Sequence, residues 1–299
     1  MKNILSQRVV KETFFKRLKD KLIEKELLER ASAFNQERRI PMAVFGNDYI
    51  GLNINIHGLY EKEYIADLYQ LMITIGVDLS NSTAIDIGAN IGNHTIEFSK
   101  YFNKVLCFEP NPRTFDILQA NTKNINNIDA FSWGCGIDRK ILKMKENYSN
   151  MGASSAKFEI EADNLVEIEI KPLDEFLDKL SKVALIKIDV EGMEVEALKG
   201  AENLINKFNP IICFEQNEWE FTEKFIETEA IDWLRAKGYR MYANFTPIMP
   251  KRKNIILRRL NNIKQLLFGI TEKRKIVEFE KFPKGIYHMF YAIHSSKMP

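Results

Sequence analysis

The sequence contains few of the features that mark secreted, metal-bound or membrane-spanning proteins. It has three cysteines in 299 residues, Cys107, Cys135 and Cys213, and no two of them have the spacing of a metal site. We therefore expect reduced, buried thiols in a cytoplasmic protein rather than a disulfide framework. No apolar run approaches the roughly 20 residues that span a bilayer. Residues 1–15 carry charges where a secretory signal would be apolar.

The composition is that of an ordinary globular protein. Hydrophobic residues make up 45% of the chain and charged residues 28%, which excludes disordered, collagen-like and coiled-coil classes. No internal repeat or low-complexity segment occurs. The length is sufficient for one large domain with a sizeable core.

The charge is unevenly distributed along the chain. Residues 1–40 hold 11 Lys/Arg against 6 Asp/Glu, and residues 251–275 hold 9 against 1, whereas residues 41–250 hold 20 against 32. An acidic body between two basic segments indicates an anionic partner, a peripheral membrane contact or a homodimer interface, or only solvated helical faces. Nucleic acid is not expected, because no stacking platform of aromatic and basic residues accompanies the acidic body.

The first 80 residues predict a helical extension over 1–40, followed by a hairpin and a helix over 41–80. Apolar residues recur at helical spacing over 8–33. Residues 43–56 alternate as in a hairpin, with Asn47-Asp48 as its turn. The helix is expected over Tyr60–Ile75.

From residue 81 onward, short apolar strands alternate with helical segments, which predicts a parallel sheet covered by helices on both faces. Two later strands, Tyr239–Phe245 and Gly285–His294, bring the expected number to seven, with the basic segment 246–284 inserted between them. The expected strands before these two are the runs TAIDIG, KVLCFEP, IDAFSW, VALIKIDV and PIICFE, and the expected helices are His94–Tyr101, Pro112–Thr122, Val195–Phe208 and Ile226–Lys237.

The strongest local signal is the turn after the first of these strands. Asp86 is followed by Gly88, Ala89, Asn90 and Gly92 in the spacing Asp-x-Gly-x-x-x-Gly. Glycine lets the backbone approach a ligand closely. The spacing differs from the dinucleotide pattern, and an acid at this turn suits a cationic head such as an ammonium group. A nicotinamide cofactor is therefore disfavoured.

A second acid lies where a ribose would be bound. Glu109 ends the next strand, 23 residues after Asp86, which is about the spacing at which an acid reaches ribose hydroxyls. Two acids without a phosphate cradle indicate S-adenosylmethionine as the cofactor.

Further acids follow the fourth and fifth strands. Asp189 and Glu191 come after the fourth, and Glu215 with Asn217 after the fifth. Ligands of doubly wound sheets bind outside the carboxyl ends of the strands, so we expect these side chains to converge with Asp86 and Glu109 on one crevice.

Several segments together resemble the FkbM-type methyltransferases. They are TAIDIGANIGNHTIEFSK, CFEPNPRTFDILQANTKNIN, KPLDEFL, IKIDVEGMEVEALKGAENLI and PIICFEQN, preceded by Gly58-Leu59-Tyr60-Glu61. The resemblance covers roughly residues 45–245. It implies a Rossmann-like, seven-stranded class I fold and an S-adenosylmethionine-dependent O-methyltransferase acting on a sugar or polyketide hydroxyl.

The resemblance also implies roles for individual residues. Asp86, Gly88, Asn90 and Gly92 would hold the methionine part of the cofactor and Glu109 the ribose. The family usually has a Ser-Asp pair at the adenine, where this chain has Gly136-Ile137-Asp138. Backbone groups of Gly136 and the side chain of Asp138 are the expected substitutes. The small-residue loop 150–155 matches a family loop near the cofactor or acceptor.

Methyl transfer to a hydroxyl requires a group that removes the proton, and general bases contribute typically about 10²–10⁴-fold. Asp189 is the first candidate, followed by Glu191 and Glu215. His94 is a rival because imidazole is the usual base near neutral pH. Asp189 with Glu215 and Asn217 also forms an oxygen set that would suit Mg²⁺.

The basic insertion has two interpretations. As a lid over the acceptor site it would recognise an anionic acceptor, such as a nucleotide-linked or phosphorylated sugar or glycan precursor. As an amphipathic helix over 255–268, its lysines and arginines would be only its solvated face. Two other functions remain open on these residues: a catalytically silent scaffold that binds S-adenosylmethionine, and a nicotinamide-dependent oxidoreductase.

Overall fold

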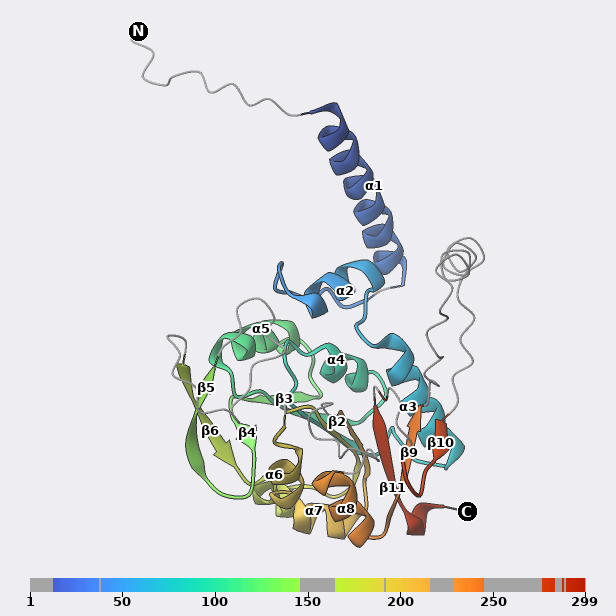
Figure 1. Cartoon of the computed structure of the whole chain (residues 1–299), viewed down its shortest axis with the longest axis vertical. Helices are drawn as coiled ribbons and strands as arrows, with labels where there is room; N and C mark the ends of the chain where they lie inside the picture. The colour runs from blue at the N-terminus through green and yellow to red at the C-terminus, as the bar shows by residue number, and fades with distance from the viewer. Residues whose placement is uncertain are drawn as a thin grey trace, which may run out of the picture. The chain divides into compact units, whose positions relative to one another are not determined.

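The computed structural model describes residues 13–37, 39–145, 165–190, 192–215, 228–244, 276–282, 287 and 289–298. The chain divides into two compact units, Met1–Tyr60 and Glu61–Pro299 (Figure 1). The division falls inside the segment 41–80.

Two helices form the described part of the unit Met1–Tyr60. Helix α1 (Phe14–Gln36) begins at Thr13, whose side chain accepts a hydrogen bond from the backbone N–H of Lys16, and none of its residues is buried. Helix α2 (Tyr49–His57) ends at Gly58, which has a φ of 76°. Residues 1–12 of the predicted N-terminal extension lie outside the description.

The hairpin predicted over residues 43–56 is wrong, because α2 forms in its place. Asp48 caps this helix: its Oδ2 accepts from the N–H of Gly51 at 3.3 Å. An Asp at the N-cap satisfies a backbone donor that a helix otherwise leaves unpaired. The cap, with a left-handed glycine at the other end, outweighs the alternation of apolar residues that suggested strands.

The unit Glu61–Pro299 is built on a mixed sheet in the order β10-β9-β11-β8-β7-β1-β2-β3. Strands β3, β2, β1, β7 and β8 run parallel, and β11 lies antiparallel between β8 and β9. The strands are β1 (Thr83–Ile87), β2 (Lys104–Phe108), β3 (Ile128–Phe131), β7 (Val183–Ile188), β8 (Ile211–Phe214), β9 (Tyr239–Asn244), β10 (Ile276–Glu278) and β11 (Phe290–His294).

The sheet has eight strands among the described residues rather than the seven expected. The additional strand, β10, pairs antiparallel with β9, Val277 opposite Ala243. A second sheet of β4 (Gly134–Cys135), β6 (Leu165–Lys171) and β5 (Lys140–Lys145) was also not predicted. The alternation of apolar and charged residues over β6 is a strand signal that could have revealed it.

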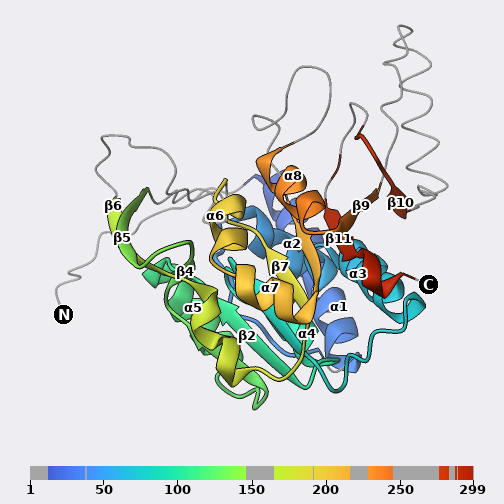
Figure 2. The ribbon, with the colours of Figure 1, turned by 90° about the horizontal axis from the view of Figure 1, so that it is seen from below.

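Helices cover both faces of the main sheet (Figures 1 and 2). Helices α3 (Lys62–Thr74), α4 (Asn93–Ser99) and α5 (Pro112–Thr122) lie on one side, and α6 (Glu194–Lys199), α7 (Glu202–Phe208) and α8 (Glu229–Ala236) on the other. Two 3₁₀ turns, η2 (Leu173–Lys179) and η4 (Ser295–Lys297), complete the described elements. The single helix expected over Val195–Phe208 is divided at Gly200-Ala201. None of the described helices is long and apolar enough to cross a membrane.

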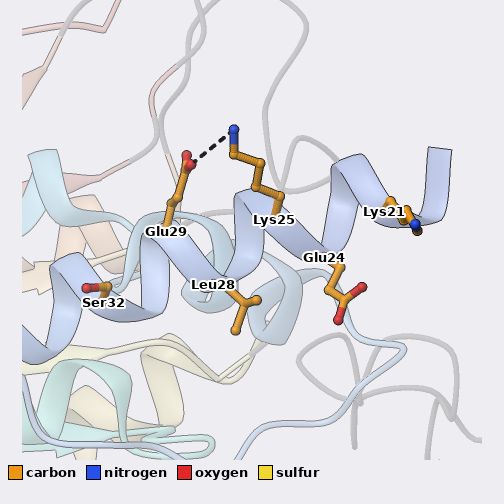
Figure 3. Close-up of a pocket in the computed structure, with 6 residues that line it drawn as sticks. All are labelled: Lys21, Glu24, Lys25, Leu28, Glu29 and Ser32. Carbon is orange, nitrogen blue, oxygen red and sulfur yellow. Dashed lines mark ion pairs between the residues drawn. The ribbon is translucent and has the colours of Figure 1, made fainter. Parts of the chain in front are cut away.

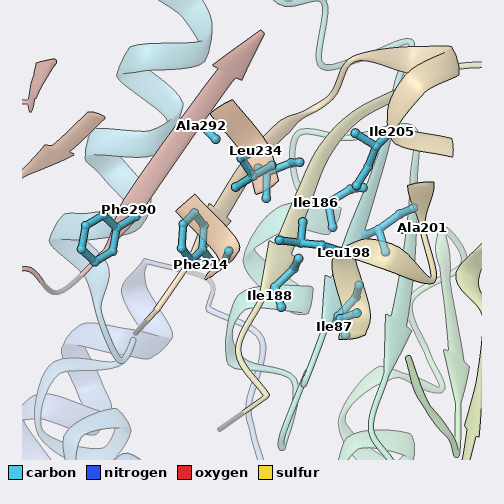
Figure 4. Packing of buried hydrophobic residues seen from close by; sticks show 14 of the residues in the cluster. Ile87, Ile186, Ile188, Leu198, Ala201, Ile205, Phe214, Leu234, Phe290 and Ala292 are labelled. Carbon is cyan, nitrogen blue, oxygen red and sulfur yellow. The ribbon is translucent and has the colours of Figure 1, made fainter. Parts of the chain in front are cut away.

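The core lies between the central strands and helices α6–α8 (Figure 4). Ile186, Ile188 and Phe214 from the strands and Leu198 and Leu234 from the helices are fully buried in it. Strands buried on both faces read as continuous apolar runs, as these do. Replacing such a side chain with alanine costs about 2–5 kcal/mol. The carboxyl ends of the strands therefore rest on a rigid support.

Candidate functional site

The turn between β1 and α4 has an unusual backbone that brings it against the end of β7. Gly88, Asn90 and Gly92 have φ angles of 77°, 50° and 93°. A Cβ on Gly88 would lie 1.8 Å from the carbonyl oxygen of Asp189. Only glycine fits at residue 88, both for its left-handed conformation and for this close approach.

The same turn is bonded to the end of β2. The backbone N–H groups of Gly88 and Ala89 donate to the carbonyl of Phe108 at 2.9 and 3.0 Å. The N–H of Asn90 donates at 2.9 Å to Oε2 of Glu109, the residue that follows β2. The turn and the acid are therefore one rigid unit.

Glu109 is held by two backbone donors. Its Oε1 accepts from the N–H of Asn111 at 2.9 Å, in addition to the bond from Asn90. Burial raises the pKa of Glu109 to about 7, although these two N–H groups oppose the rise and Asp189 and Asp86 add to it. Each carboxylate oxygen keeps a lone pair for a hydroxyl donor.

Three polar atoms beside Glu109 lack hydrogen-bond partners in the described part of the chain. They are Oδ1 of Asn90, Nδ2 of Asn111 and Oγ1 of Thr114, and all are buried. Buried polar atoms in native structures are nearly always paired, so this set suits a polar ligand. The glycine turn, the pinned carboxylate and these atoms together fit a nucleoside with free ribose hydroxyls.

Behind the turn, a buried lysine joins two acids. Asp86 on β1 is fully buried, and its Oδ2 accepts from Oγ1 of Thr95 at 2.5 Å. Nζ of Lys187 lies 3.8 Å from Oδ1 of Asp86 and donates to Oδ2 of Asp189 at 3.1 Å. The side chain of Lys187 is 2% exposed, and that of Asp189 is 33% exposed.

The lysine is charged despite its burial. Burial alone would lower the pKa of Lys187, but Asp189, Asp86, Glu215 and Glu61 raise it above its usual value. A buried ammonium of this kind is stable only while its carboxylate partners remain. It therefore ties the ends of β1 and β7 together.

Glu61 also belongs to this cluster. The sequence analysis named it only as part of a segment that resembles the family and predicted no role for it. It precedes α3 with φ 56° and ψ 29°, a left-handed conformation rare for residues other than glycine. Its Oε2 lies 3.2 Å from Nε2 of His94 on α4. Burial disfavours its charge, but His94 and Lys187 outweigh this and lower its pKa.

Glu215 is the protonated member of the cluster. It follows β8, and its N–H bonds to the carbonyl of Ile188 at 3.4 Å. Burial is the main cause that raises its pKa, and the charges of Asp189 and Glu61 raise it further. Its side chain is hydrogen-bonded to that of Glu61. Glu61 therefore carries the charge of this pair, and Glu215 carries its proton.

The structure thus brings some of the predicted site residues together and leaves others apart. Asp86, Asp189, Glu215 and His94 form one connected cluster beside the glycine turn. Gly136 is buried, and its N–H bonds to the carbonyl of Lys171 at 3.1 Å. Asp138 is exposed, in the turn before β5. Glu191, Asn217, the loop 150–155 and residues 246–275 of the basic insertion lie outside the described residues.

The described residues do not fit the predicted magnesium set. No group of three or more His, Cys, Asp or Glu side chains in the described part of the chain could hold a metal ion. Oδ2 of Asp189 already accepts from Lys187, and the raised pKa of Glu215 leaves its carboxyl protonated, a poor ligand for a hard cation. Asn217 lies outside the described residues.

A surface hollow of about 480 Å³ is found elsewhere, in the unit Met1–Tyr60. Its described lining comes from one face of α1 and includes Leu28 and the ion pair of Lys25 with Glu29, 3.7 Å apart (Figure 3). It contains none of the residues discussed above.

Several known proteins similar to this chain are named methyltransferases. It is 25% identical over 179 residues to Methyltransferase 1 of Beauveria bassiana, covering 50% of this chain and 72% of the relative. It is 29% identical over 130 residues to the hexuronic acid methyltransferase AglP of Haloferax volcanii, covering 42% and 53%. A solved structure, methyltransferase FkbM of Methylobacillus flagellatus, has 18% identity and a TM-score of 0.39, covering 73% of this chain and 56% of that one.

The chain spans about half the length of the Haloferax volcanii relative and of that solved structure. The sequence model described as the methyltransferase FkbM domain matches residues 86–241, just over half of the chain. This range runs from the acid before the glycine turn to strand β9. The chain is therefore a methyltransferase and belongs to the FkbM family.

Proposed function

We propose that this enzyme transfers the methyl group of S-adenosylmethionine to a hydroxyl of a sugar or glycan precursor. The observation that carries the proposal is the position of Glu109. Its buried carboxylate is bonded to the N–H of Asn90 in the glycine turn and still has lone pairs for two hydroxyl donors. A pyrophosphate would be repelled at such a site, whereas an unphosphorylated ribose would be bound.

The residues around the turn have distinct roles in this proposal. Glu109 accepts the ribose hydroxyls, and the turn from Gly88 to Gly92 holds the methionine part. The side chain of exposed Asp138 holds the adenine, because the N–H of Gly136 is already bonded to the carbonyl of Lys171. Asp86 acts from beneath the turn through its negative charge, because it is fully buried. The bound cofactor would supply an electrophilic methyl group at this site.

The acceptor class is proposed from one relative and from the charge of the site. AglP of Haloferax volcanii is named for methylating a hexuronic acid, which favours a sugar hydroxyl. The described cluster is acidic, and its one buried ammonium, on Lys187, is already paired with Asp189 and Asp86. An anionic group on the acceptor would therefore need the basic insertion 246–284, which we propose as its lid.

The reaction also needs a group that accepts the proton of the hydroxyl. Asp189 has an accessible carboxylate, with its side chain one-third exposed beside Gly88. His94 is buried and Glu215 half-buried within the same cluster, and Glu191 is the fourth candidate.

Calorimetric titration tests the cofactor directly. S-adenosylmethionine and S-adenosylhomocysteine should bind and NAD should not. Glu109→Ala should weaken binding roughly 10–150-fold, since hydrogen bonds to a charged group are worth about 1.5–3 kcal/mol. Glu63→Ala, which removes an exposed glutamate of α3, is the matched control and should bind like the wild type.

Turnover is tested with tritiated S-adenosylmethionine against hexoses, hexuronic acids, sugar phosphates and nucleotide sugars. Label in at least one of these classes, absent with Glu109→Ala, is the expected result. Binding of NAD instead of S-adenosylmethionine would contradict the proposal. Label in none of these sugar classes would refute the acceptor class.

A further inference from the structure

We propose that Glu61 is a positioning residue that fixes the ring of His94, so that His94 accepts the proton released by the acceptor hydroxyl. This inference rests on the proposed methyl transfer to a hydroxyl, and it assigns the step in which the proton leaves. Glu61 starts α3, and His94 lies in the first turn of α4, directly after the glycine turn.

The two side chains are each other's partner in a closed environment. Oε2 of Glu61 and Nε2 of His94 are 3.2 Å apart, and the side chains are 9% and 10% exposed. Neither atom makes a hydrogen bond in the described part of the chain, so the approach of 3.2 Å is an ion-pair contact close enough for one to form. Since buried polar atoms are nearly always paired, the contact defines how the ring is held.

The backbone of Glu61 supports the same assignment. Acidic residues at a helix N-cap usually accept hydrogen bonds from the first turn, but the side chain of Glu61 makes no such bond to α3. It reaches His94 instead, from a left-handed backbone conformation with φ 56°. Such conformations persist where surrounding contacts hold them, and they concentrate at functional sites.

The other described acids of the cluster are engaged elsewhere. Oδ2 of Asp189 accepts from Lys187. Asp86 is fully buried and bonded to Thr95, and Glu215 is bonded to Glu61. Of these acids, Asp189 is partly exposed and keeps an oxygen, Oδ1, outside the bonds just described. His94 and Asp189 are therefore the two candidates, and we assign the proton to His94 because the carboxylate of Glu61 stabilises its charged form.

The acceptor oxygen would lose its O–H proton as it bonds to the methyl carbon that bound S-adenosylmethionine would supply, and the electron pair of the broken carbon–sulfur bond would stay on the sulfur. The proton goes to Nδ1 of His94. The imidazolium that results is neutralised through its Nε2–H by the carboxylate of Glu61. A carboxylate behind a histidine commonly fixes its tautomer in this way.

The tautomer of His94 can be measured without an acceptor. In ¹⁵N-histidine-labelled protein, long-range ¹H–¹⁵N spectra distinguish a protonated nitrogen from an unprotonated one. The chain has four histidines, and His94→Gln identifies the signal. We expect neutral His94 to be protonated at Nε2 and unprotonated at Nδ1. The opposite tautomer in the wild type would overturn the proposal, and this outcome requires no variant to fold.

Variants of Glu61 separate positioning from general structure. Glu61→Leu should replace the single tautomer with a mixture, whereas Glu61→Gln should retain it because the amide oxygen still accepts from Nε2–H. Glu63→Leu, an exposed change on the same helix, should leave the spectrum unchanged. A wild-type spectrum in Glu61→Leu, with the other histidine signals in place, would refute the role of Glu61.

Cofactor binding distinguishes this inference from the proposed function. Glu61→Leu should bind S-adenosylhomocysteine within about twofold of the wild type, while Glu109→Ala should not. If the wild type binds neither cofactor form, the proposed function fails, and the tautomer of His94 still tests whether Glu61 positions its ring.

With a sugar acceptor, His94→Gln should lower kcat at least 100-fold and leave KM unchanged. A larger loss in Asp189→Asn would assign the base to Asp189.

Discussion

The carbonyl oxygen of Asp189 lies so close to Gly88 that a Cβ on that glycine would be 1.8 Å from it. This contact joins the turn after β1 to the end of β7. It brings the predicted cofactor turn and the first candidate base within direct contact of each other.

Gly88→Ala should therefore both destabilise the fold and abolish cofactor binding. Gly76 is a matched control, because it has φ 74° against 77° for Gly88 but no atom within 4 Å of its would-be Cβ. Gly76→Ala should lower the free energy of unfolding by about 1–2 kcal/mol, the cost of a left-handed alanine. Gly88→Ala should lose clearly more in urea titrations, and calorimetry should detect no binding. Equal effects of the two changes would show that the close approach is unimportant.

Glu109 should make stability and cofactor affinity depend on pH in opposite directions. Burial raises its pKa in the folded state to about 7, from 4.5. Between these values the folded state binds the proton more tightly than the unfolded state, so stability falls as pH rises. The loss in the free energy of unfolding should reach about 3 kcal/mol above pH 7.

The comparison of wild type with Glu109→Gln isolates this effect. From pH 5 to pH 8 the unfolding free energy of the wild type should fall relative to that of Glu109→Gln, because only the wild type ionises at this residue. S-adenosylmethionine should bind the wild type more tightly at pH 8 than at pH 6, because the ionised carboxylate is the better acceptor for ribose hydroxyls. A flat difference across this range would contradict the raised pKa.

Lys187→Met should be strongly destabilising. It leaves Asp86 and Asp189 without the ammonium that lies 3.8 and 3.1 Å from them, and breaking a buried ion pair on one side costs about 3–5 kcal/mol. Lys182→Met removes a lysine from an exposed pair with Asp78 at 3.4 Å, and it should leave stability nearly unchanged. Urea unfolding of both variants measures the difference, and similar midpoints would show that the buried pair is weak.

Removal of divalent metal should leave the enzyme unaffected. The ammonium of Lys187 bonds to Oδ2 of Asp189, so a Mg²⁺ ion at that carboxylate would be repelled by a fixed positive charge. Cofactor binding and methyl transfer should be equal after dialysis against EDTA and after addition of Mg²⁺. Activity lost on chelation and restored by Mg²⁺ would show that a metal site is completed by residues outside those described.

Much of the fold could be predicted from local patterns. The apolar runs from TAIDIG to PIICFE form parallel strands, and the periodic segment Pro112–Thr122 forms helix α5 with the same bounds. These patterns reflect burial on both faces, and every strand inside a covered sheet is buried in this way and reads as an apolar run. The hairpin over 43–56 failed because the cap at Asp48 acts on the backbone and leaves the apolar alternation unchanged.

The candidate site could be predicted only in part from the sequence. The positions of Asp86 near the end of its strand and of Glu109, Asp189 and Glu215 after theirs follow from the sequence, because parallel strands end at one edge. The role of Glu61 could not be found in this way. It lies before the first strand, and only the fold brings it to His94 and Glu215.

The sequence by itself determined the parallel strands of the main sheet, the placement of the acids at the ends of those strands and the family to which the chain belongs. Only the tertiary structure decided the charge that each acid carries. Burial disfavours charge on both Glu61 and Glu215, but His94 and Lys187 lower the pKa of Glu61, whereas the charges of Asp189 and Glu61 raise the pKa of Glu215. These effects depend on distances between segments far apart in the chain, and local sequence patterns do not contain those distances.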